Sequence, residues 1–152
     1  KGVIVKEKSK NVLDLYCGTG TIGIYISDVV SKITGIEVVS DAIEAANVNK
    51  KRNNVENIEF ILGKVEDKLD FISNNNIDTI IVDPPRSGLH KKVIPILEKI
   101  SPKTIIYVSC NPITMARDIN LLSNNYELVE VTPYDMFPNT YHVETVCVLK
   151  KK

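Results

Sequence analysis

The sequence predicts an α/β domain built on a doubly wound, mostly parallel sheet that ends in an antiparallel β-hairpin. Short β-branched runs alternate with helical patterns five times along the chain, which is typical of βα units. Two strand-like runs then follow each other with no helix between them, as an antiparallel edge pair requires. The unusual residues of the chain follow the predicted strands, at the edge where such sheets bind ligands.

The elements follow one another without a repeat or an internal linker. We expect the parallel strands at residues 11–16, 32–38, 57–63, 78–83 and 103–109. Helices are expected at 20–31, 40–54, 65–75, 91–100 and 113–125. Ser40 or Asp41 is the predicted N-cap of the second helix, and Pro95 fits the first turn of the fourth. The final two strands are predicted at 126–137 and 142–151, so residues 1–152 make one domain.

Composition limits the classes of protein that this chain can be. It has 152 residues, with 19 basic and 19 acidic side chains, so it lacks the net positive charge typical of an autonomous nucleic-acid binder. No apolar stretch approaches the roughly 20 residues that span a bilayer, and no signal-peptide pattern opens the sequence. Three widely spaced cysteines and two isolated histidines predict neither a disulfide framework nor a metal site. We therefore expect a cytoplasmic protein without a metal.

A glycine-rich loop follows the first predicted strand. Gly18, Gly20 and Gly23 match the GxGxxG spacing of a dinucleotide fold, which alone is weak evidence. Asp14 lies in the strand end beside this loop and would repel the pyrophosphate of NAD. The ammonium and sulfonium groups of S-adenosylmethionine (SAM) would instead be attracted to it. Glu37, at the end of the second strand, can accept hydrogen bonds from ribose hydroxyls of either ligand, so the loop favours SAM over NAD without excluding a plain βα turn.

The segments "DPPRSGL" and "YVSCNP" follow the fourth and fifth strands. Asp-Pro-Pro followed by an aromatic ring is typical of methyltransferases that act on exocyclic base amines, but the fourth residue here is Arg86. Carbon 5 of a pyrimidine is a poor nucleophile, and it becomes reactive when a thiolate adds to carbon 6. A base must then remove the carbon 5 proton. Cys110 could provide the thiolate, and Glu144, with a pKa raised by apolar neighbours, could provide the base.

Four motifs together resemble the RNA uracil-5-methyltransferase family: "DLYCGTGTIG", "DPPRSGL", "VSCNPITMARD" and "DMFPNTYHVETV". The resemblance implies a Rossmann-like class I SAM-dependent methyltransferase fold and synthesis of 5-methyluridine in RNA. It implies that Cys110 is the nucleophile and Glu144 the base, and that Asp83 lies between SAM and the target base. Cofactor contacts are expected from Asp14, Tyr16, Gly18, Gly20, Glu37 and Asp83.

The same resemblance sets expectations for partners and domains. We expect an RNA substrate, ribosomal RNA in preference to tRNA, no membrane or DNA partner, and a monomer. The chain begins almost directly on its first strand, so the N-terminal RNA-binding barrel, the central domain and an upstream glutamine of the family are expected to be absent. Weak SAM binding is the expected consequence.

Alternatives remain open from the residues alone. The chain could methylate an exocyclic base amine, or be a non-catalytic nucleotide- or RNA-binding fragment. Arg86 could bind RNA phosphate or pair with Asp83, and His142 and Cys17 fit structural roles. Cys110 could also be a passive thiol and Glu144 an exposed charge at a sheet edge.

Overall fold

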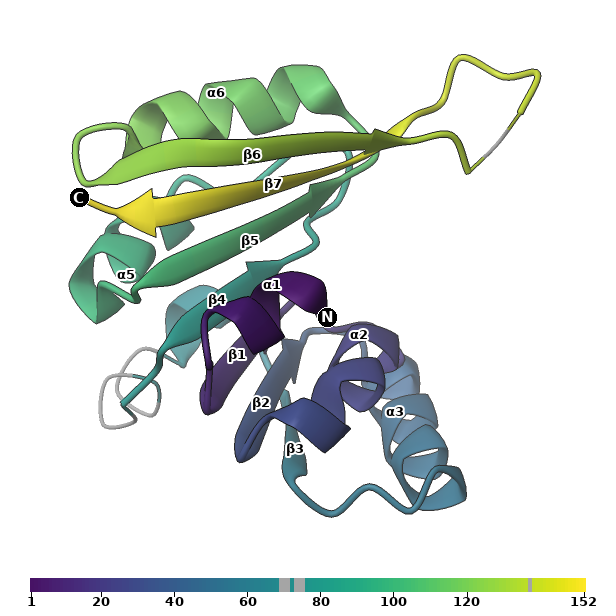
Figure 1. Ribbon diagram of the computed structural model, residues 1–152. Coiled ribbons are helices and arrows are strands. Elements are labelled where there is room, and N and C mark those ends of the chain that lie inside the picture. The colour runs from purple at the N-terminus through teal and green to yellow at the C-terminus, as the bar shows by residue number, and fades with distance from the viewer. Residues whose placement is uncertain (69–71, 73–75, 137) are drawn as a thin grey trace.

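The computed structural model describes residues 1–68, 72, 76–136 and 138–152, which form a seven-stranded sheet with helices on both faces (Figure 1). The strands lie in the order β3-β2-β1-β4-β5-β7-β6. The five strands of the parallel part are β1 (Asn11–Leu15), β2 (Lys32–Glu37), β3 (Ile58–Leu62), β4 (Thr79–Val82) and β5 (Thr104–Ser109). The predicted fold class is confirmed.

The last two strands form the predicted hairpin, β6 (Tyr126–Tyr134) and β7 (Glu144–Lys151). The final strand, β7, inserts between β5 and β6 and is antiparallel to both, so β6 forms the edge of the sheet. Their connection extends beyond the end of the sheet (Figure 1). This arrangement brings the start of β7 to the edge where the parallel strands end.

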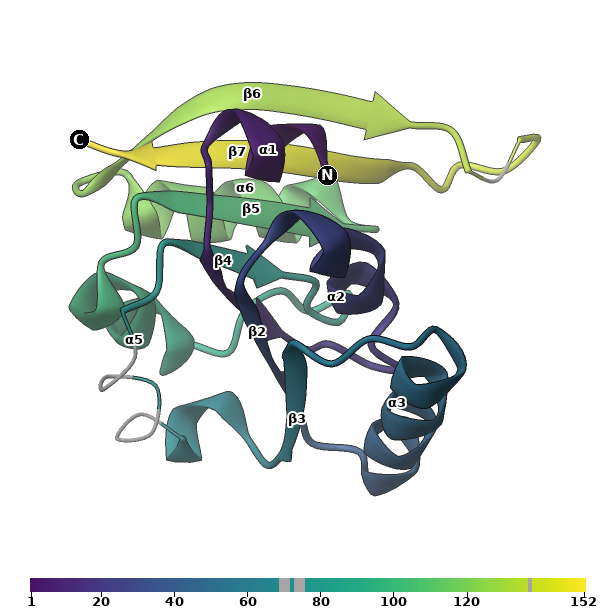
Figure 2. The same cartoon turned by 60° about the horizontal axis from the view of Figure 1, so that its bottom comes forward.

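Helices cover the two faces of the sheet and bury two apolar clusters (Figure 2). The helices α1 (Gly2–Lys6), α2 (Thr21–Ile26) and α3 (Ser40–Arg52) lie on one side, and α5 (Val93–Ile100) and α6 (Pro112–Leu122) on the other. Alternate residues of each strand face opposite sides. On β5, for example, Ile105 and Tyr107 face the α5–α6 cluster, whereas Ile106 faces the α1–α2 cluster.

Several helix predictions need correction. Helix α1 precedes the first strand, where none was expected, because Ile4 is buried against the sheet. The helix expected at 20–31 divides into α2 and a 3₁₀ turn, η1 (Ser27–Val29), where the Ser27 hydroxyl donates to the Ile24 carbonyl at 2.8 Å. Of the helix expected at 65–75, Val65–Asp67 form a 3₁₀ turn, η2, and Ile72 is helical; residues 69–71 and 73–75 of that prediction lie outside the described residues.

The predicted N-cap of α3 is also wrong. The helix begins at Ser40 after Val39, and neither Ser40 nor Asp41 makes a side-chain capping bond. The Glu37 carboxylate instead accepts from the backbone N–H groups of Val38 and Val39, at 2.8 and 3.0 Å. The Glu37 carboxylate therefore fixes the backbone that leads into α3. Pro95 lies in the first turn of α5, as predicted.

Candidate active site

The candidate site lies at the carboxyl edge of the parallel strands, around the point where the strand order reverses. The chain moves outward from β1 through β2 to β3 on one side, and β4 begins the other side. Ligands of doubly wound sheets bind at this switch point. The loop after β1 and the Asp83–Leu89 segment after β4 therefore flank it.

The loop after β1 holds a tight, partly left-handed conformation. Tyr16, Gly18 and Gly20 have positive φ angles of 62, 51 and 79°. A Cβ atom on Gly20 would lie 2.4 Å from the Phe60 ring and 3.2 Å from Ala46, so no other residue fits without displacing β3 or α3. The predicted role of the glycines as loop-shaping residues agrees with this geometry.

Glu37 is held at the end of β2 by backbone donors. Its second carboxylate oxygen accepts from the Gly18 N–H at 3.1 Å, which fastens the glycine loop to the strand end. A cavity of about 200 Å³ opens beside Glu37. Its other walls are Tyr16, Ile36, Val38, Gly63, Lys64, Val65, Glu66 and His90. A largely apolar cavity with the Glu37 carboxylate at its side suits a nucleoside, since the ring can pack while the hydroxyls donate to the carboxylate.

Asp14 is completely buried in β1, and neither of its carboxylate oxygens has a hydrogen-bond partner among the described residues. Burial raises the pKa of Asp14 to about 7, and the nearby charge of Asp83 adds to the increase. Buried carboxylates are normally paired or hydrogen-bonded. An unpartnered acid at the end of β1 is therefore an acceptor available to a ligand with hydrogen-bond donors or positive charge.

Cys110 and Glu144 stand next to the last residue pair that joins β5 and β7. Ser109 of β5 lies opposite Thr145 of β7 in the last pair of this ladder, and one further step of the same register would set Cys110 opposite Glu144. Directly opposite residues have Cβ atoms about 4.5–5.5 Å apart. The register therefore favours an approach of the residues predicted as nucleophile and base, which lie 34 positions apart in the sequence.

Asp83 joins this pair from β4. Successive residues of a strand point to opposite faces of the sheet. Ile81, Ile106 and Val146 face α1 and α2. Continuing the alternation along the strands assigns the same face to Asp14, Asp83, Cys110 and Glu144. Asp83 is solvent-exposed, yet desolvation by the surrounding protein raises its pKa to about 6, and the negative charge of Glu144 contributes. The predicted placement of Asp83 between the glycine loop and the catalytic pair thus agrees with the electrostatic coupling to both Asp14 and Glu144.

The surroundings of the three cysteines distinguish them. None forms a disulfide, and Cys17 and Cys147 are buried. Desolvation raises the pKa of both buried thiols, and the charges of Asp14 and Glu37 raise that of Cys17 further. Such thiols give little nucleophilic thiolate. Cys110 alone among the three is partly exposed, at the strand end where a substrate could reach it.

Arg86 points away from Asp83. Its guanidinium lies 3.3 Å from Nδ1 of His142, whose ring contacts that of Tyr141 at a tilt of 41° with centroids 4.2 Å apart. No ion pair joins Arg86 to Asp83 in the part of the chain that the structure describes. Arg86 therefore connects the segment after β4 to the segment before β7, and the open alternative of an Asp83–Arg86 pair is wrong.

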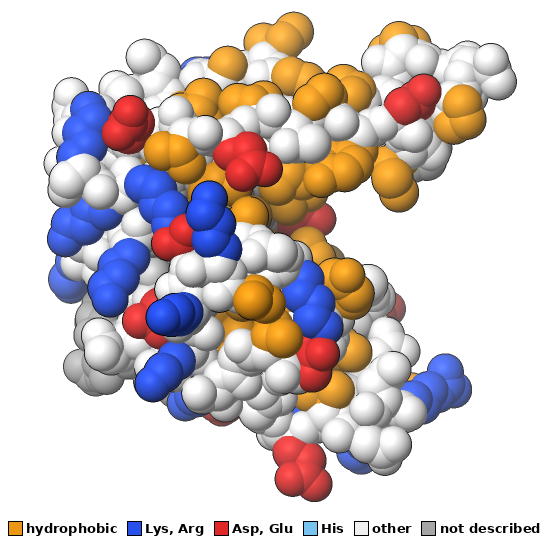
Figure 3. Space-filling view, viewed as in Figure 1, with side chains coloured by type: hydrophobic (Ala, Val, Ile, Leu, Met, Phe, Trp, Pro, Cys, Tyr) orange, Lys and Arg blue, Asp and Glu red, His pale blue; other side chains and the backbone are white. Residues whose placement is uncertain are grey.

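The face that carries Cys110 and Glu144 is hollowed beside them. Figure 3 shows a recess, lined largely by hydrophobic side chains, between the β6–β7 hairpin and α2. Its volume is about 500 Å³, and Ile22, Ile106, Val108, Tyr134 and Val146 contribute to its walls. The catalytic edge is thus approached over an apolar surface.

Sequence reasoning missed much of the wall around the Glu37 cavity. Gly63, Lys64, Val65 and Glu66 follow β3, and His90 follows the proline turn. The signal was available, because the segment "GKVED" also stands at the carboxyl end of a parallel strand. Among the described residues no group of three or more His, Cys, Asp or Glu side chains could hold a metal ion, and no helix is long and apolar enough to cross a membrane.

Similarity to solved structures defines the class of protein to which this chain belongs. The sheet and helices superpose on an rRNA methylase from Streptococcus thermophilus with a TM-score of 0.72 at 16% identity, over 95% of this chain and 87% of the other. At that identity the likeness concerns the fold alone, which is that of a class I SAM-dependent methyltransferase. A structure from Pyrococcus abyssi, a tRNA (uracil-54, C5)-methyltransferase in complex with S-adenosyl-L-homocysteine, has a TM-score of 0.83 and 41% identity, over 92% of this chain and 34% of that one.

The family follows from sequence. Residues 3–152 match the model of the tRNA (uracil-5-)-methyltransferase family, so the chain belongs to that family. An uncharacterized RNA methyltransferase from Nanoarchaeum equitans is 50% identical over 147 residues, covering 95% of this chain and 32% of the relative. One from Clostridium acetobutylicum is 46% identical over 143 residues, covering 92% and 31%. The chain thus spans about a third of the length of the curated relatives that it matches.

Proposed function

We propose that this chain is the catalytic domain of an RNA methyltransferase that transfers a methyl group from SAM to carbon 5 of a uridine. The observation that carries the proposal is the register of β5 and β7, whose last pair, Ser109 and Thr145, stands next to Cys110 and Glu144 in a chain of this family. A thiol and a carboxylate across one pocket are the two groups that carbon 5 chemistry requires.

The residues around the glycine loop fit SAM. Glu37 stands beside a nucleoside-sized cavity, where its carboxylate can accept from ribose hydroxyls. Asp14 has two buried oxygens without partners, which suits the positively charged amino-acid part of SAM. When bound, SAM supplies an electrophilic methyl group to the target carbon. The Pyrococcus relative was solved with S-adenosyl-L-homocysteine, which supports the same ligand class here.

The chain's own residues account for the remaining chemistry. The Cys110 thiolate adds to carbon 6 of the uracil ring, and the electron pair moves onto carbon 5 and the 4-carbonyl. After carbon 5 has gained the methyl group, the Glu144 carboxylate removes its proton. The electrons of that C–H bond restore the 5,6 double bond and expel the Cys110 thiolate, so both side chains can return to their starting state once Glu144 releases its proton. Asp83, between the two halves of the site, would contact SAM and the target base.

Glu144 acts only after methyl transfer in this scheme, which gives its variant a distinctive behaviour. Glu144→Gln should accumulate a methylated RNA–protein adduct on ordinary uridine-containing RNA. Cys110→Ala should form no 5-methyluridine. Nucleoside mass spectrometry of the product tests the scheme, because Cys110→Ala would retain transfer if an exocyclic amine were the target. Methylated adenine, guanine or cytosine as the wild-type product would contradict the uridine assignment.

The RNA class is the finer part of the proposal. Ribosomal RNA, favoured by the sequence analysis, stays a prediction. The Pyrococcus neighbour is named for a tRNA uridine, which makes tRNA the competing substrate. Methylation of the purified ribosomal and transfer RNA fractions by the same protein preparation decides between them. That the enzyme is a monomer and that it does not methylate DNA also stay predictions.

A further inference from the structure

The second half of the "VSCNPITMARD" motif has no role in the chemistry above. Arg117 and Asp118 lie in α6, seven and eight residues beyond Cys110, and the Asp118 side chain is only 1% exposed. A buried carboxylate stays charged in a protein only when donors surround it. The elements that supply those donors are the ones that Asp118 connects.

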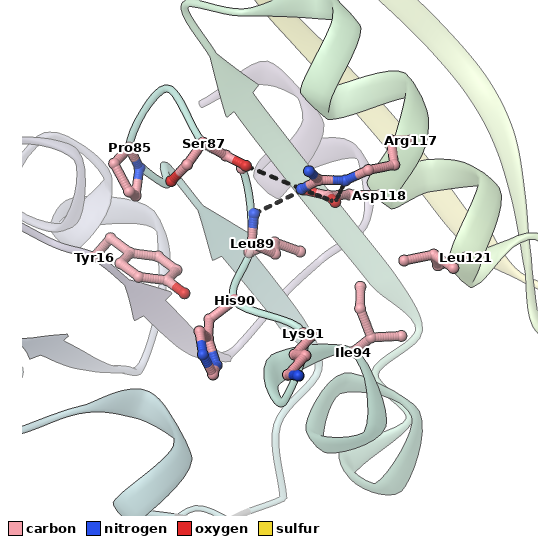
Figure 4. A pocket seen from close by; sticks show the side chains of 11 residues that line it. Tyr16, Pro85, Ser87, Leu89, His90, Lys91, Ile94, Arg117, Asp118 and Leu121 are labelled. Carbon is pink, nitrogen blue, oxygen red and sulfur yellow. Dashed lines mark hydrogen bonds and ion pairs between the residues drawn. The ribbon is translucent and has the colours of Figure 1, made fainter.

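Four donors surround the Asp118 carboxylate, and Figure 4 shows those that come from Leu89 and Arg117. One oxygen accepts from the Leu89 backbone N–H and the Tyr107 hydroxyl, both at 2.7 Å. The other accepts from Nε and Nη2 of Arg117, at 2.9 and 2.7 Å. Asp118 therefore ties three elements together: α6 itself, β5 through Tyr107, and the segment after β4 through Leu89.

Neighbouring bonds strengthen the attachment of the segment after β4. Arg117 also donates to the Ser87 carbonyl at 3.0 Å. A Cβ atom on Gly88, whose φ is +81°, would lie 2.5 Å from the Asp118 carboxylate, so the turn passes directly against it. At the other end of the turn, the Arg86 carbonyl accepts from the side chains of Asn111 and Thr114, both at 3.1 Å.

These contacts connect the two halves of the proposed site. The segment that Asp118 holds begins at Asp83, and the helix that carries Asp118 begins two residues after Cys110. We propose that Asp118 is a positioning residue, which keeps the Asp83–Leu89 segment in fixed register with the Cys110 thiol. The inference rests on the proposed function, since its consequence is that the methyl donor and the nucleophile are aligned on the same uracil ring.

Backbone amide exchange tests the register independently of catalysis. Asp118→Leu removes every acceptor at a similar volume, and Asp118→Asn keeps one oxygen, so exchange at the Leu89 amide should rise by at least about tenfold in the first and less in the second. Amides in the centre of β5 should keep wild-type rates. Asp28→Asn, an exposed carboxylate paired with Lys1, is the matched control and should change neither. Wild-type exchange at Leu89 in both Asp118 variants would overturn the proposal.

The rate constant for methyl transfer tests the consequence. A misaligned nucleophile costs catalysis rather than binding, so Asp118→Leu should reduce kcat by about 10- to 100-fold with the RNA KM within about threefold. Partial recovery of kcat is expected in Asp118→Asn. A loss of kcat that merely follows the fraction of folded protein, with faster exchange throughout β5, would contradict a positioning role. If the wild-type chain transfers no methyl group, the proposed function fails separately, and Leu89 exchange still decides whether Asp118 holds the register.

Discussion

Replacing Asp14 by asparagine should stabilise the fold at neutral and alkaline pH. The carboxylate is fully buried in β1, its oxygens have no hydrogen-bond partners among the described residues, and it faces the charge of Asp83. Its pKa is raised from 3.8 to about 7. The folded state therefore binds this proton more tightly than the unfolded chain does, and ionising Asp14 costs stability.

The size of the effect follows from the pKa difference. The cost is absent below the unfolded-state pKa near 4, grows as the pH rises, and is complete above the folded-state pKa near 7. One pKa unit corresponds to 1.36 kcal/mol, so the cost reaches about 4 kcal/mol at pH 8 and about 2 kcal/mol at pH 5. Asparagine has the shape of the acid without its charge. Asp14→Asn should therefore exceed the wild type by about 4 kcal/mol at pH 8 and by about half of that at pH 5.

Urea denaturation of both proteins at pH 5 and pH 8 measures these differences as free energies of unfolding. Calorimetric titration measures the affinity of both proteins for SAM. The variant loses the negative charge proposed to attract the ligand, so it should bind SAM more weakly. A residue that lowers stability while strengthening binding would explain why a buried, unpaired acid stands in this strand. A variant no more stable than the wild type at pH 8, or an advantage that increases toward pH 5, would refute the reasoning.

Three further changes probe other parts of the account. Gly20→Ala should lower the free energy of unfolding by roughly 2–4 kcal/mol, because the left-handed φ and the contacts with Phe60 and Ala46 both oppose a Cβ atom; wild-type stability would show that the loop relaxes freely. Glu37→Gln should weaken SAM binding by about tenfold or more through the loss of charge-assisted bonds to the ribose, and unchanged affinity in calorimetry would place the nucleoside elsewhere. The Tyr141 ring is 89% exposed and contacts His142, so it could receive an unpaired RNA base. Tyr141→Ala should then raise the RNA KM by roughly 5- to 100-fold. An unchanged KM in steady-state assays would reject that contact.

Hydrophobic pattern and strand topology explain most of what could be predicted. The five parallel strands appear within one residue of their expected limits. The β-branched runs of β1, β2, β4 and β5 are buried on both faces, whereas β3 at the sheet edge is only partly buried. Parallel strands share a carboxyl edge, so Asp83 and the glycine loop were expected to meet there. The proposed approach of Cys110 to Glu144 depends on β7 inserting beside β5, which the local pattern did not predict.

The errors occurred where tertiary contacts override local preference. Ser40 and Asp41 are good capping residues, yet Glu37 supplies the carboxylate that binds the preceding N–H groups. The direction of Arg86 depends on His142, 56 positions away. The role of Asp118 likewise depends on Leu89, which comes from a different βα unit, so its partner could not be read from the helix that carries it.

The covalent step is tested most directly with RNA containing 5-fluorouridine. Fluorine at carbon 5 leaves no proton for Glu144 to remove, so the enzyme should remain attached to the methylated ring. Incubation with SAM, protease digestion and mass spectrometry should find the modified nucleotide on the peptide that contains Cys110, and on neither Cys17 nor Cys147. Methyl transfer by the wild-type chain without any adduct, or an adduct that persists in Cys110→Ala, would contradict the assignment of Cys110 as the nucleophile.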